Sequence, residues 1–434
     1  MHLRRNLALL FTANTISNFA SGITMLAIPW YLVNLPESEN GNFKAISMMV
    51  GVTFVTLFWG LYAGSLIDRY NRKRIFQILQ FSDALLVGAS GLYAHFTGEM
   101  PFLAIALVAT VTICSWTLFY PNLYAFCQEL VQPKYYKQVN SAVELQGQVT
   151  NFLGMLVGPI LLAGQLSFDW GFLSADLGFR KWTLGEIFLL DAGTYFLSAT
   201  IISLIRYTPG DYMAKSAGSL LSRLNEGFQF LRERRPLLLF GIASHNIFFT
   251  LLVFIQVGLA LYVSGHLGYG FEEGAAVFGG FEVLYSLGAI VTGLLGMVLA
   301  RLMQRTNLIK QVIFLLALAT TVYFTFTFTK IELILYLGAF CVGIANSGTR
   351  ILRITYIIRI APNHMIGRVN TFFGSVNIVF RLSLLAILLL PFFSAPGNAG
   401  NIIWGIVIMG GICALSGLLL VIFFRSFDQK SAYG

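Results

Sequence analysis

The feature that most constrains this chain is a series of continuous apolar runs. Of its 434 residues, 57% are apolar and 11% are charged, whereas a soluble domain carries about 25% charged residues. A helix needs about 20 apolar residues to cross a bilayer, and the strands of a membrane barrel would alternate instead. The sequence therefore predicts an all-α membrane protein with twelve transmembrane helices. We place the spans near residues 7–33, 44–67, 75–96, 101–126, 140–165, 184–205, 237–263, 274–302, 309–329, 331–350, 369–393 and 401–424.

One long polar segment, 207–236, divides these runs into two groups of six. Apolar residues such as Leu220 and Leu224 recur in it at helical spacing among several arginines, which indicates an amphipathic helix. We expect this cytoplasmic linker to lie on the inner membrane surface. It would join an N-terminal six-helix bundle, 1–206, to a C-terminal six-helix bundle, 237–434.

The two groups also repeat one another. The pattern Gly-x-x-x-Ala-Arg at 296–301, after the eighth span, echoes Gly-x-x-x-Asp-Arg at 64–69, after the second span. Two parallel six-helix repeats fit this spacing. The second copy has Ala300 where the first has Asp68. An aspartate can cap the N-terminus of a neighbouring helix, and we expect this role to be lost in the second copy.

Basic residues gather on alternate segments between the spans. The exceptions among the 28 Lys and Arg residues are Lys44, Arg180, Lys181 and Lys330 on the other side and Arg381 within a span. By the positive-inside rule, the basic segments and both termini lie in the cytoplasm. We therefore expect an integral protein of the plasma membrane, which is the inner membrane in a bacterium. Its net charge of +9 would face lipid headgroups rather than nucleic acid.

The four cysteines lie in or at the ends of apolar runs and show no C-x-x-C spacing. We expect small buried hydrophobic residues, with no disulfide, metal or cofactor. The first apolar run follows Arg4 and Arg5, as in a signal peptide. Because it continues to Val33 without a cleavage site, it is better interpreted as the first span.

The turn after the second span reads Gly64-Ser-Leu-Ile-Asp68-Arg69-Tyr-Asn-Arg72-Lys73-Arg74. Its glycine lets a helix end approach a neighbour closely, its aspartate suits the electropositive N-terminus of a helix, and its bases hold the loop in the cytoplasm. This pattern resembles the loop between transmembrane helices 2 and 3 of the major facilitator superfamily. The resemblance covers most of the chain.

That resemblance implies a transporter made of two six-helix bundles that works by alternating access. It implies that Gly64, Asp68 and Arg69 form an inner gate, with Asp68 capping the start of the eleventh span. Arg69 or Arg72 would pair with Glu129 at the end of the fourth span. Such contacts would hold the outward-facing state and break as the cavity opens inward.

In the fifth span, Gly154, Gly158 and Pro159 belong to a pattern that resembles the glycine-proline motif of drug:proton antiporters in this superfamily. Glycines four residues apart permit close helix contact, and proline bends a helix; helix packing alone is an equal alternative. The arginine frequent in the family's fourth span has no match between 101 and 126, so its proton-transfer role cannot be carried over. The chain looks closest to the branch of macrolide-efflux proteins and the enterobactin exporter.

Charged residues deep in the spans are candidate functional groups, because their burial is costly unless they face water or a partner. We expect a coupling proton to bind Glu282, about 12 Å into the eighth span, since desolvation disfavours an ionised carboxylate. His245, about 14 Å into the seventh span, is the second candidate. Arg381 would pair with Glu282 or hold an anionic group of the substrate. A structural role is favoured for Asp83 and Asp191.

The other candidates form polar stripes at helical spacing. The resemblance implies that spans 1, 4, 7 and 10 line the cavity. For each stripe, a wet cavity and interhelical hydrogen bonds without substrate contact are equal alternatives. The substrate-cavity candidates are Asn14, Asn18, Glu144, Gln148, Asn151, Gln256, Asn346, Arg350, Asn377 and Arg381.

The leading hypothesis is a secondary active transporter, a monomer among membrane lipids, that exports an amphiphilic drug-like or siderophore-like molecule in exchange for protons. A proton-coupled importer of a siderophore, metal or nutrient is the alternative within transport. A membrane lipid-modifying enzyme is disfavoured because G-x-S-x-G, H-E-x-x-H and paired His/Asp motifs are missing, and the missing P-loop disfavours an ATP-driven pump. A non-transporting sensor is the remaining alternative.

Overall fold

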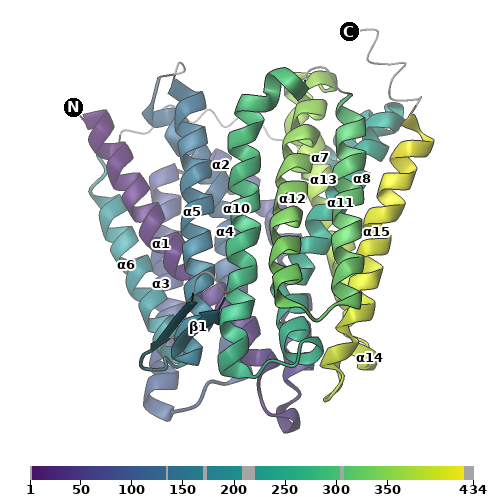
Figure 1. The fold of residues 1–434 in the computed structure, drawn as a ribbon. Helices are drawn as coiled ribbons and strands as arrows, with labels where there is room; N and C mark the ends of the chain where they lie inside the picture. The colour runs from purple at the N-terminus through teal and green to yellow at the C-terminus, as the bar shows by residue number, and fades with distance from the viewer. Residues whose placement is uncertain (1, 133–134, 170–173, 208–219, 304–306, 425–434) are drawn as a thin grey trace. The chain divides into compact units, whose positions relative to one another are not determined.

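The computed structural model describes residues 2–132, 135–169, 174–207, 220–303 and 307–424. Eleven helical segments in these ranges are long and apolar enough to span a membrane. Helix α5 (Tyr136–Ala163) is a further helix of 28 residues. The predicted all-α membrane fold with twelve long helices is therefore confirmed (Figure 1).

Contacts divide the chain into two compact units. The first comprises Met1–Ala217 and Tyr269–Gly279, and the second comprises Gly218–Gly268 and Gly280–Gly434. The division near residue 217 falls inside the polar segment 207–236. The domain bounds expected from the sequence stay a prediction.

In the first unit, α1 packs against α5 and α6, α3 packs against α4 and α6, and α2 packs against α4. The side chain of Trp30, near the end of α1, is fully buried. It stacks on Phe271 and Phe278, with ring centroids 6.0 and 5.1 Å away. The elements of this unit besides α5 are α1 (His2–Val33), η1 (Glu37–Glu39), α2 (Gly41–Arg69), α3 (Arg72–Thr97), α4 (Phe102–Leu130), β1 (Gln165–Asp169), β2 (Ser174–Gly178) and α6 (Leu184–Ser203).

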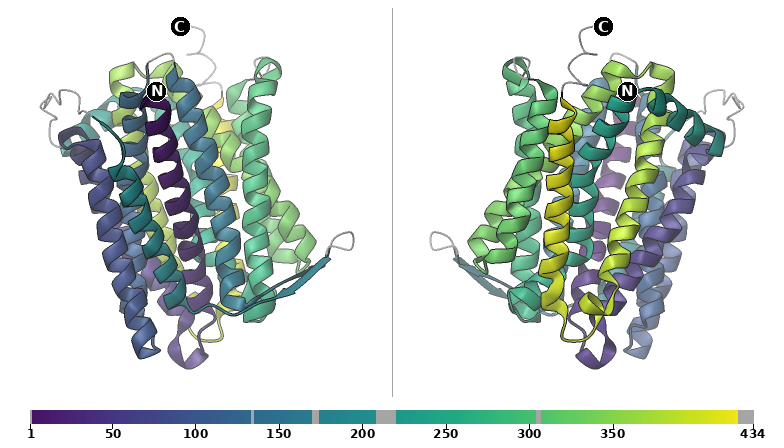
Figure 2. Two further views of the ribbon diagram at one scale, coloured as in Figure 1. Left: turned by 90° about the vertical axis from the view of Figure 1, so that its left-hand side faces the viewer. Right: turned by 90° about the vertical axis from the view of Figure 1, so that its right-hand side faces the viewer.

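A short β-hairpin is the element that the sequence analysis did not anticipate. Gly164 ends α5 in the left-handed conformation, with φ 72°, which glycine adopts without steric cost. The chain then enters β1, which pairs antiparallel with β2 from Gln165 opposite Gly178 to Asp169 opposite Ser174. In Figure 2 the hairpin extends outward from the end of α5. The sequence does not indicate the hairpin because the hairpin lies next to a long apolar run and each of its strands has only five residues.

In the second unit, the seventh span is the helical segment Arg235–His266. Two π-helical segments lie within it. Such segments are rare and occur frequently at functional sites. The elements are α7 (Leu220–Glu233), α8 (Arg235–Val253), η3 (Phe254–Gly258), α9 (Leu259–Leu261), η4 (Tyr262–His266), α10 (Phe271–Met303, whose first turns belong to the first unit), α11 (Leu308–Phe328), α12 (Glu332–Ile360), α13 (Asn363–Leu388), α14 (Pro391–Ser394), η5 (Ala399–Asn401) and α15 (Ile402–Ile422).

Helix α12 continues ten residues beyond the end expected from the sequence. The apolar run in the sequence placed the end of this span near Arg350. In the structure Arg353 is buried and donates from a guanidinium nitrogen to the backbone oxygen of Ser244 at 2.9 Å. The helix ends at Ile360 instead, just before Pro362, where the residue preceding a proline disfavours helix.

The amphipathic helix expected in the polar segment is α7, and it packs on α13. A Cβ at Gly227 would lie 2.7 Å from the backbone oxygen of Arg368, so the two helices touch closely there. The guanidinium of Arg368 pairs with Glu226 at 2.9 Å, and Phe228 stacks on Phe372 with centroids 5.6 Å apart. The position of α7 on a membrane surface stays a prediction.

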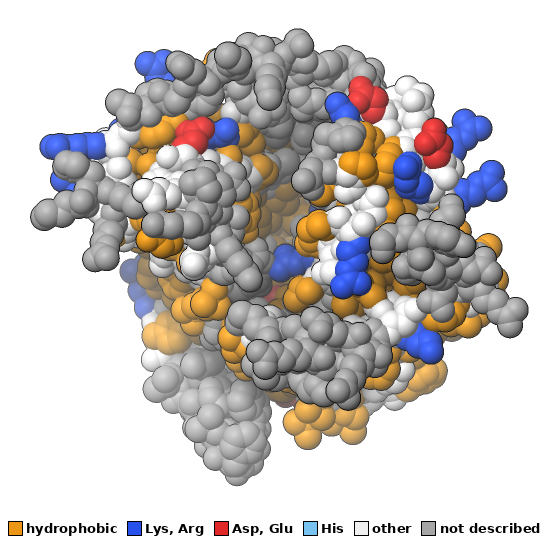
Figure 3. All heavy atoms as spheres, turned by 90° about the horizontal axis from the view of Figure 1, so that it is seen from above, with side chains coloured by type: hydrophobic (Ala, Val, Ile, Leu, Met, Phe, Trp, Pro, Cys, Tyr) orange, Lys and Arg blue, Asp and Glu red, His pale blue; other side chains and the backbone are white. Residues whose placement is uncertain are grey.

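In the first unit, basic side chains lie at the helix ends on the side where α1 begins. Figure 3 looks onto that side and shows Lys and Arg side chains in blue on it. This distribution is what the positive-inside rule would favour for cytoplasmic ends. These residues of the first unit are Arg5, Arg72, Lys73, Arg74 and Arg206. Within the second unit, helix ends carry Arg232, Arg234, Arg235, Arg359 and Arg368.

Candidate functional site

Two glycines bring α10 and α12 together beside the proposed proton carrier. A Cβ at Gly288 would lie 2.1 Å from the backbone oxygen of Phe340, and one at Gly343 would lie 2.1 Å from that of Tyr285. Glycine at both positions therefore lets the two backbones touch. This contact places the polar residues of α12 directly against those of α10.

Glu282 is enclosed in the second unit. Its side chain is 1% exposed, and its Oε1 atom has no hydrogen-bond partner in the described part of the chain. An unpaired buried carboxylate is costly when ionised. The role of Glu282 in proton coupling stays a prediction.

Tyr285, one helical turn after Glu282 on α10, binds a side-chain amide of α12. Asn346 of α12 donates from Nδ2 to the hydroxyl oxygen of Tyr285 at 2.9 Å. Tyr285 also interacts electrostatically with Glu282 and Arg350. The structure thus brings together three sequence candidates, Glu282, Asn346 and Arg350, around one tyrosine.

His245 lies on α8 against α13. Its Nδ1 atom is 2.7 Å from the backbone oxygen of Gly241, and its ring stacks on Phe373 with centroids 5.2 Å apart. Arg353 interacts electrostatically with it. The imidazole is thus held by a backbone carbonyl and an aromatic ring. In the described part of the chain it forms no ion pair with Glu282.

Two further candidates on α13 are buried with free donors. Asn377 and Arg381 are 6% and 7% exposed, and Nδ2 of Asn377 and Nε of Arg381 have no partner among the described residues. The expected pairing of Arg381 with Glu282 is not among the ion pairs of the described chain. The free donors leave Arg381 available for an anionic group. Gln256, in the π-helical segment η3, likewise has an unpartnered Oε1.

The asparagines of α1 have partners in the first unit. Asn18 donates to Asn14 at 2.8 Å, and Asn14 donates to Oε1 of Gln146 on α5 at 3.0 Å. Gln146 in turn donates to the backbone oxygen of Phe11 at 2.5 Å. This chain of amides joins α1 to α5, which is the interhelical alternative considered for this stripe. A substrate role for Asn14 and Asn18 stays a prediction.

The same helix pair carries the glycine-proline motif. A Cβ at Gly154 would lie 2.2 Å from the backbone oxygen of Phe19, and one at Gly158 would lie 2.4 Å from that of Ile23. Both glycines therefore face α1 and permit the close approach, and Pro159 follows inside α5. The antiporter interpretation of the motif stays a prediction.

The pair expected at the inner gate is present within the first unit. Nε of Arg72 donates to Oε1 of Glu129 at 2.5 Å, and the hydroxyl of Tyr207 also donates to Glu129. The two charged side chains are 17% and 26% exposed. The pair joins the start of α3 to the end of α4. Its role in gating stays a prediction.

Because this ion pair is partly exposed, we expect it to contribute at most about 1 kcal/mol to stability. Arg72→Ala and Glu129→Gln should each lower the free energy of unfolding by a similar small amount, and the double variant by less than their sum. Unfolding titrations of the four proteins in detergent measure this coupling. Strictly additive effects would show that the pair contributes nothing. The more exposed pair of Lys44 and Glu39 is the matched control, with a smaller coupling expected.

Six of the sequence candidates cannot be placed further. The structure describes Gly64, Asp68, Arg69, Glu144, Gln148 and Asn151 only by their place in α2 and α5.

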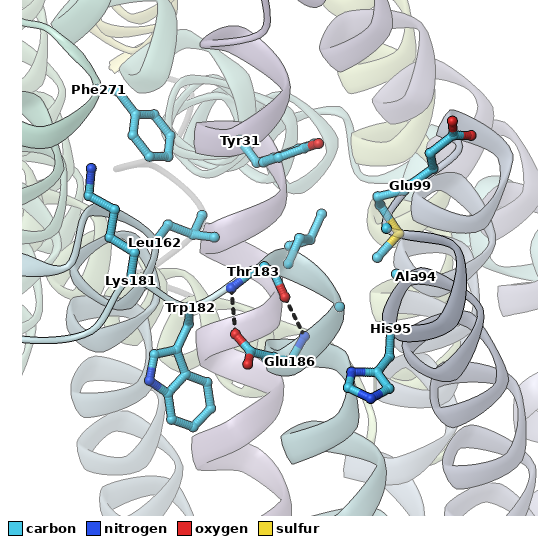
Figure 4. A pocket seen from close by; sticks show the side chains of 14 residues that line it. Tyr31, Ala94, His95, Glu99, Leu162, Lys181, Trp182, Thr183, Glu186 and Phe271 are labelled. Atoms are coloured by element: carbon cyan, nitrogen blue, oxygen red, sulfur yellow. Dashed lines mark hydrogen bonds between the residues drawn. The ribbon is translucent and has the colours of Figure 1, made fainter.

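A surface pocket of about 460 Å³ lies in the first unit, at the end where α1, α3 and α5 finish. Figure 4 shows Glu186 bound to Thr183 at its floor: the Thr183 backbone donates to Glu186 at 2.8 Å and the Glu186 backbone donates to the Thr183 hydroxyl at 3.2 Å. Glu186 also pairs with Arg180, and Lys181 pairs with Glu272. The charged groups here are largely paired with one another.

The sequence analysis missed Gln146 and Tyr285. A signal for Gln146 exists, because Gln146, Thr150, Gly154 and Gly158 follow one another at four-residue spacing and so share the face that packs on α1. No such signal exists for Tyr285, since an aromatic residue in an apolar span is usually a packing residue.

Long apolar helices with polar groups enclosed within each unit define a polytopic membrane protein. The Major Facilitator Superfamily profile matches residues 10–380, so the chain belongs to that superfamily. It is a transporter and not an enzyme.

Solved transporter structures share this fold. A mutant of the nucleoside transporter NupG aligns with a TM-score of 0.73 at 12% identity, over 96% of this chain and 100% of the other. A bacterial homolog of the human lysosomal transporter Spinster aligns with a TM-score of 0.68 at 13% identity, over 98% of this chain and 97% of the other. A bacterial homologue of the iron transporter ferroportin aligns with a TM-score of 0.63 at 14% identity, over 96% of this chain and 100% of the other. At such identities the likeness concerns the fold alone. No curated protein sequence matched the chain.

Proposed function

We propose that this protein is a proton-coupled exporter of an amphiphilic small molecule that works by alternating access in the cytoplasmic membrane. The observation that carries the proposal is Glu282, a fully buried carboxylate with an unpaired oxygen. A group that must be neutral when enclosed and can ionise when water reaches it couples a proton to a conformational change.

The surroundings of Glu282 favour this role. Asn346 donates to Tyr285, which interacts electrostatically with the Glu282 carboxylate. Arg381, buried in the same unit with a free Nε atom, offers a charge for an anionic group of the substrate. We assign substrate contact to Asn346, Asn377 and Arg381 on these grounds.

Import is the second candidate. Solved transporters with similar folds are named for nucleosides and iron, so substrates other than amphiphilic drug-like molecules occur on this fold. Export is favoured here by the glycine-proline pattern of α5, which resembles that of drug:proton antiporters.

Reconstituted vesicles test the direction. A substrate is first found by thermal-shift screening of the purified protein against siderophores, antibiotics and lipids, since a ligand that binds the folded state stabilises it by mass action. We then expect substrate to move against an imposed proton gradient, out of the compartment equivalent to the cytoplasm as protons enter. Movement of substrate and protons in the same direction would establish import, and gradient-independent flux would contradict proton coupling.

A further inference from the structure

Helix α13 carries a buried positive charge that no acidic side chain of the described residues neutralises. Arg381 is 7% exposed and belongs to none of the ion pairs in that part of the chain. A guanidinium keeps its charge in proteins, and on the proposed function Glu282 is neutral while it is enclosed. A buried charge without a counter-charge is strongly destabilising. An anion from outside the chain would therefore be bound favourably at Arg381.

A second free donor lies one helical turn before this arginine. Asn377 is 6% exposed, and its Nδ2 atom, like Nε of Arg381, has no hydrogen-bond partner among the described residues. Residues four apart on a helix are neighbours, with Cβ atoms about 5–6 Å from one another. Both donors can therefore reach one small acceptor group. A carboxylate fits them, because it offers two acceptor oxygens and forms charge-assisted hydrogen bonds with a guanidinium.

The face of α13 that carries these donors is open on one side of them. Asn370 and Gly374 precede Asn377 and Arg381 at helical spacing, so the four positions share one face. Asn370 and Gly374 are exposed, and a Cβ built at Gly374 would meet no atom within 4 Å. The body of a ligand has room there while its charged group binds Arg381.

The same face is closed beyond Arg381 and is separate from the exposed apolar side of the helix. Three leucines at most 2% exposed follow on it: Leu384, Leu385 and Leu388. The apolar side chains of Val379 and Ile387 are 46% and 39% exposed, and both lie at least about 120° around the helix axis from Arg381. A ligand would thus enter along the polar face from the Asn370 side, with its carboxylate first.

We propose that the transported substrate is an amphiphilic anion whose carboxylate binds between Arg381 and Asn377. This inference rests on the proposed function and adds the charge of the substrate, which the proposed function leaves open. A cationic amphiphile would meet the guanidinium with like charge, which is unfavourable for binding. Arg381 thus selects anions.

Thermal unfolding of the purified full-length protein tests this preference with three probes on one scaffold: naphthaleneacetate, its uncharged amide and naphthylethylammonium. We expect naphthaleneacetate to raise the midpoint more than the other two, because a ligand of the folded state stabilises it by mass action. Arg381→Met should weaken binding of naphthaleneacetate at least about tenfold, the loss of one hydrogen bond to a charged group. Arg359→Gln, which changes an exposed arginine of the same unit, should leave the binding unchanged.

The stability of the ligand-free protein separates binding from a structural role. Arg381→Met removes an unpaired buried charge and should raise the ligand-free midpoint, whereas replacing a structural arginine would lower it. A lower ligand-free midpoint would overturn the inference. No stabilisation by naphthaleneacetate, equal stabilisation by the three probes, or undiminished binding in Arg381→Met would overturn it as well.

Membrane potential distinguishes failure of this inference from failure of the proposed function. A monoanion exported in exchange for one proton moves two charges, and without proton movement it still moves one, so a potential negative on the cytoplasmic side drives its export. We expect a potassium-diffusion potential without a pH gradient to drive naphthaleneacetate out of proteoliposomes faster than out of Arg381→Met vesicles. Export that ignores the potential would overturn the anion inference. Export that follows the potential but ignores a pH gradient would support it and contradict the proposed proton coupling.

Discussion

Glu282→Gln is expected to reduce proton-driven transport by at least about 100-fold, the size of effect typical of removing a proton-transfer group. Glutamine preserves the shape of the side chain but takes up no proton in this range of pH. The buried site would be permanently neutral, so substrate movement would no longer be tied to proton movement. Flux in proteoliposomes under an imposed pH gradient measures the effect.

Two controls make this result specific. Glu273→Gln changes an exposed glutamate of the same helix and should leave the flux unchanged. Substrate exchange without a gradient should survive in Glu282→Gln, because it requires the conformational change but no net proton transfer. Gradient-driven flux at the wild-type rate would remove Glu282 from the coupling mechanism and leave His245 as the candidate.

Gly154→Ala is expected to destabilise the protein by about 1–3 kcal/mol, the usual cost of overpacking. The new Cβ would lie 2.2 Å from the backbone oxygen of Phe19 and 3.1 Å from Cα of Gly22. Backbone atoms cannot turn aside as a flexible side chain does, so α1 and α5 must separate. The hydrogen bond of Asn14 with Gln146 would lengthen as a consequence.

Gly147→Ala, in the same helix, is the matched control. A Cβ there meets only the ring of Tyr120, at 3.8 Å, which is ordinary contact. Because alanine is favoured over glycine in a helix by about 0.5–1 kcal/mol, this variant should be as stable as the wild type or more so. The free energies of unfolding of both variants in detergent test the pair. Equal effects would show that α5 does not approach α1 at Gly154.

Much of the fold could be predicted from the sequence because the bilayer imposes simple lengths. Apolar runs of about 20 residues must be helices there, since every backbone polar group has to be satisfied within its own segment. Helix ends were less accurate. The tenth span was expected to end near Arg350, whereas α12 continues to Ile360 and Arg353 is held inside the unit by Ser244.

The candidate site could be predicted only as single positions. Depth in a span singled out Glu282, His245 and Arg381, because burial of a charge is costly wherever it happens. Partners could not be predicted from depth. Asn346 meets Tyr285 because Gly288 and Gly343 let two helices touch, and the sequence does not say which helix each glycine faces.

The sequence by itself thus determined the class of protein, its helices and the positions of its buried polar groups, because these follow from length, apolarity and helical period along one segment. Only the tertiary structure decided that Asn14 meets Gln146 and that Ser21 meets Asp191. These pairings join helices far apart in the sequence, so they depend on how side chains of different helices pack. No local pattern of residues contains that information.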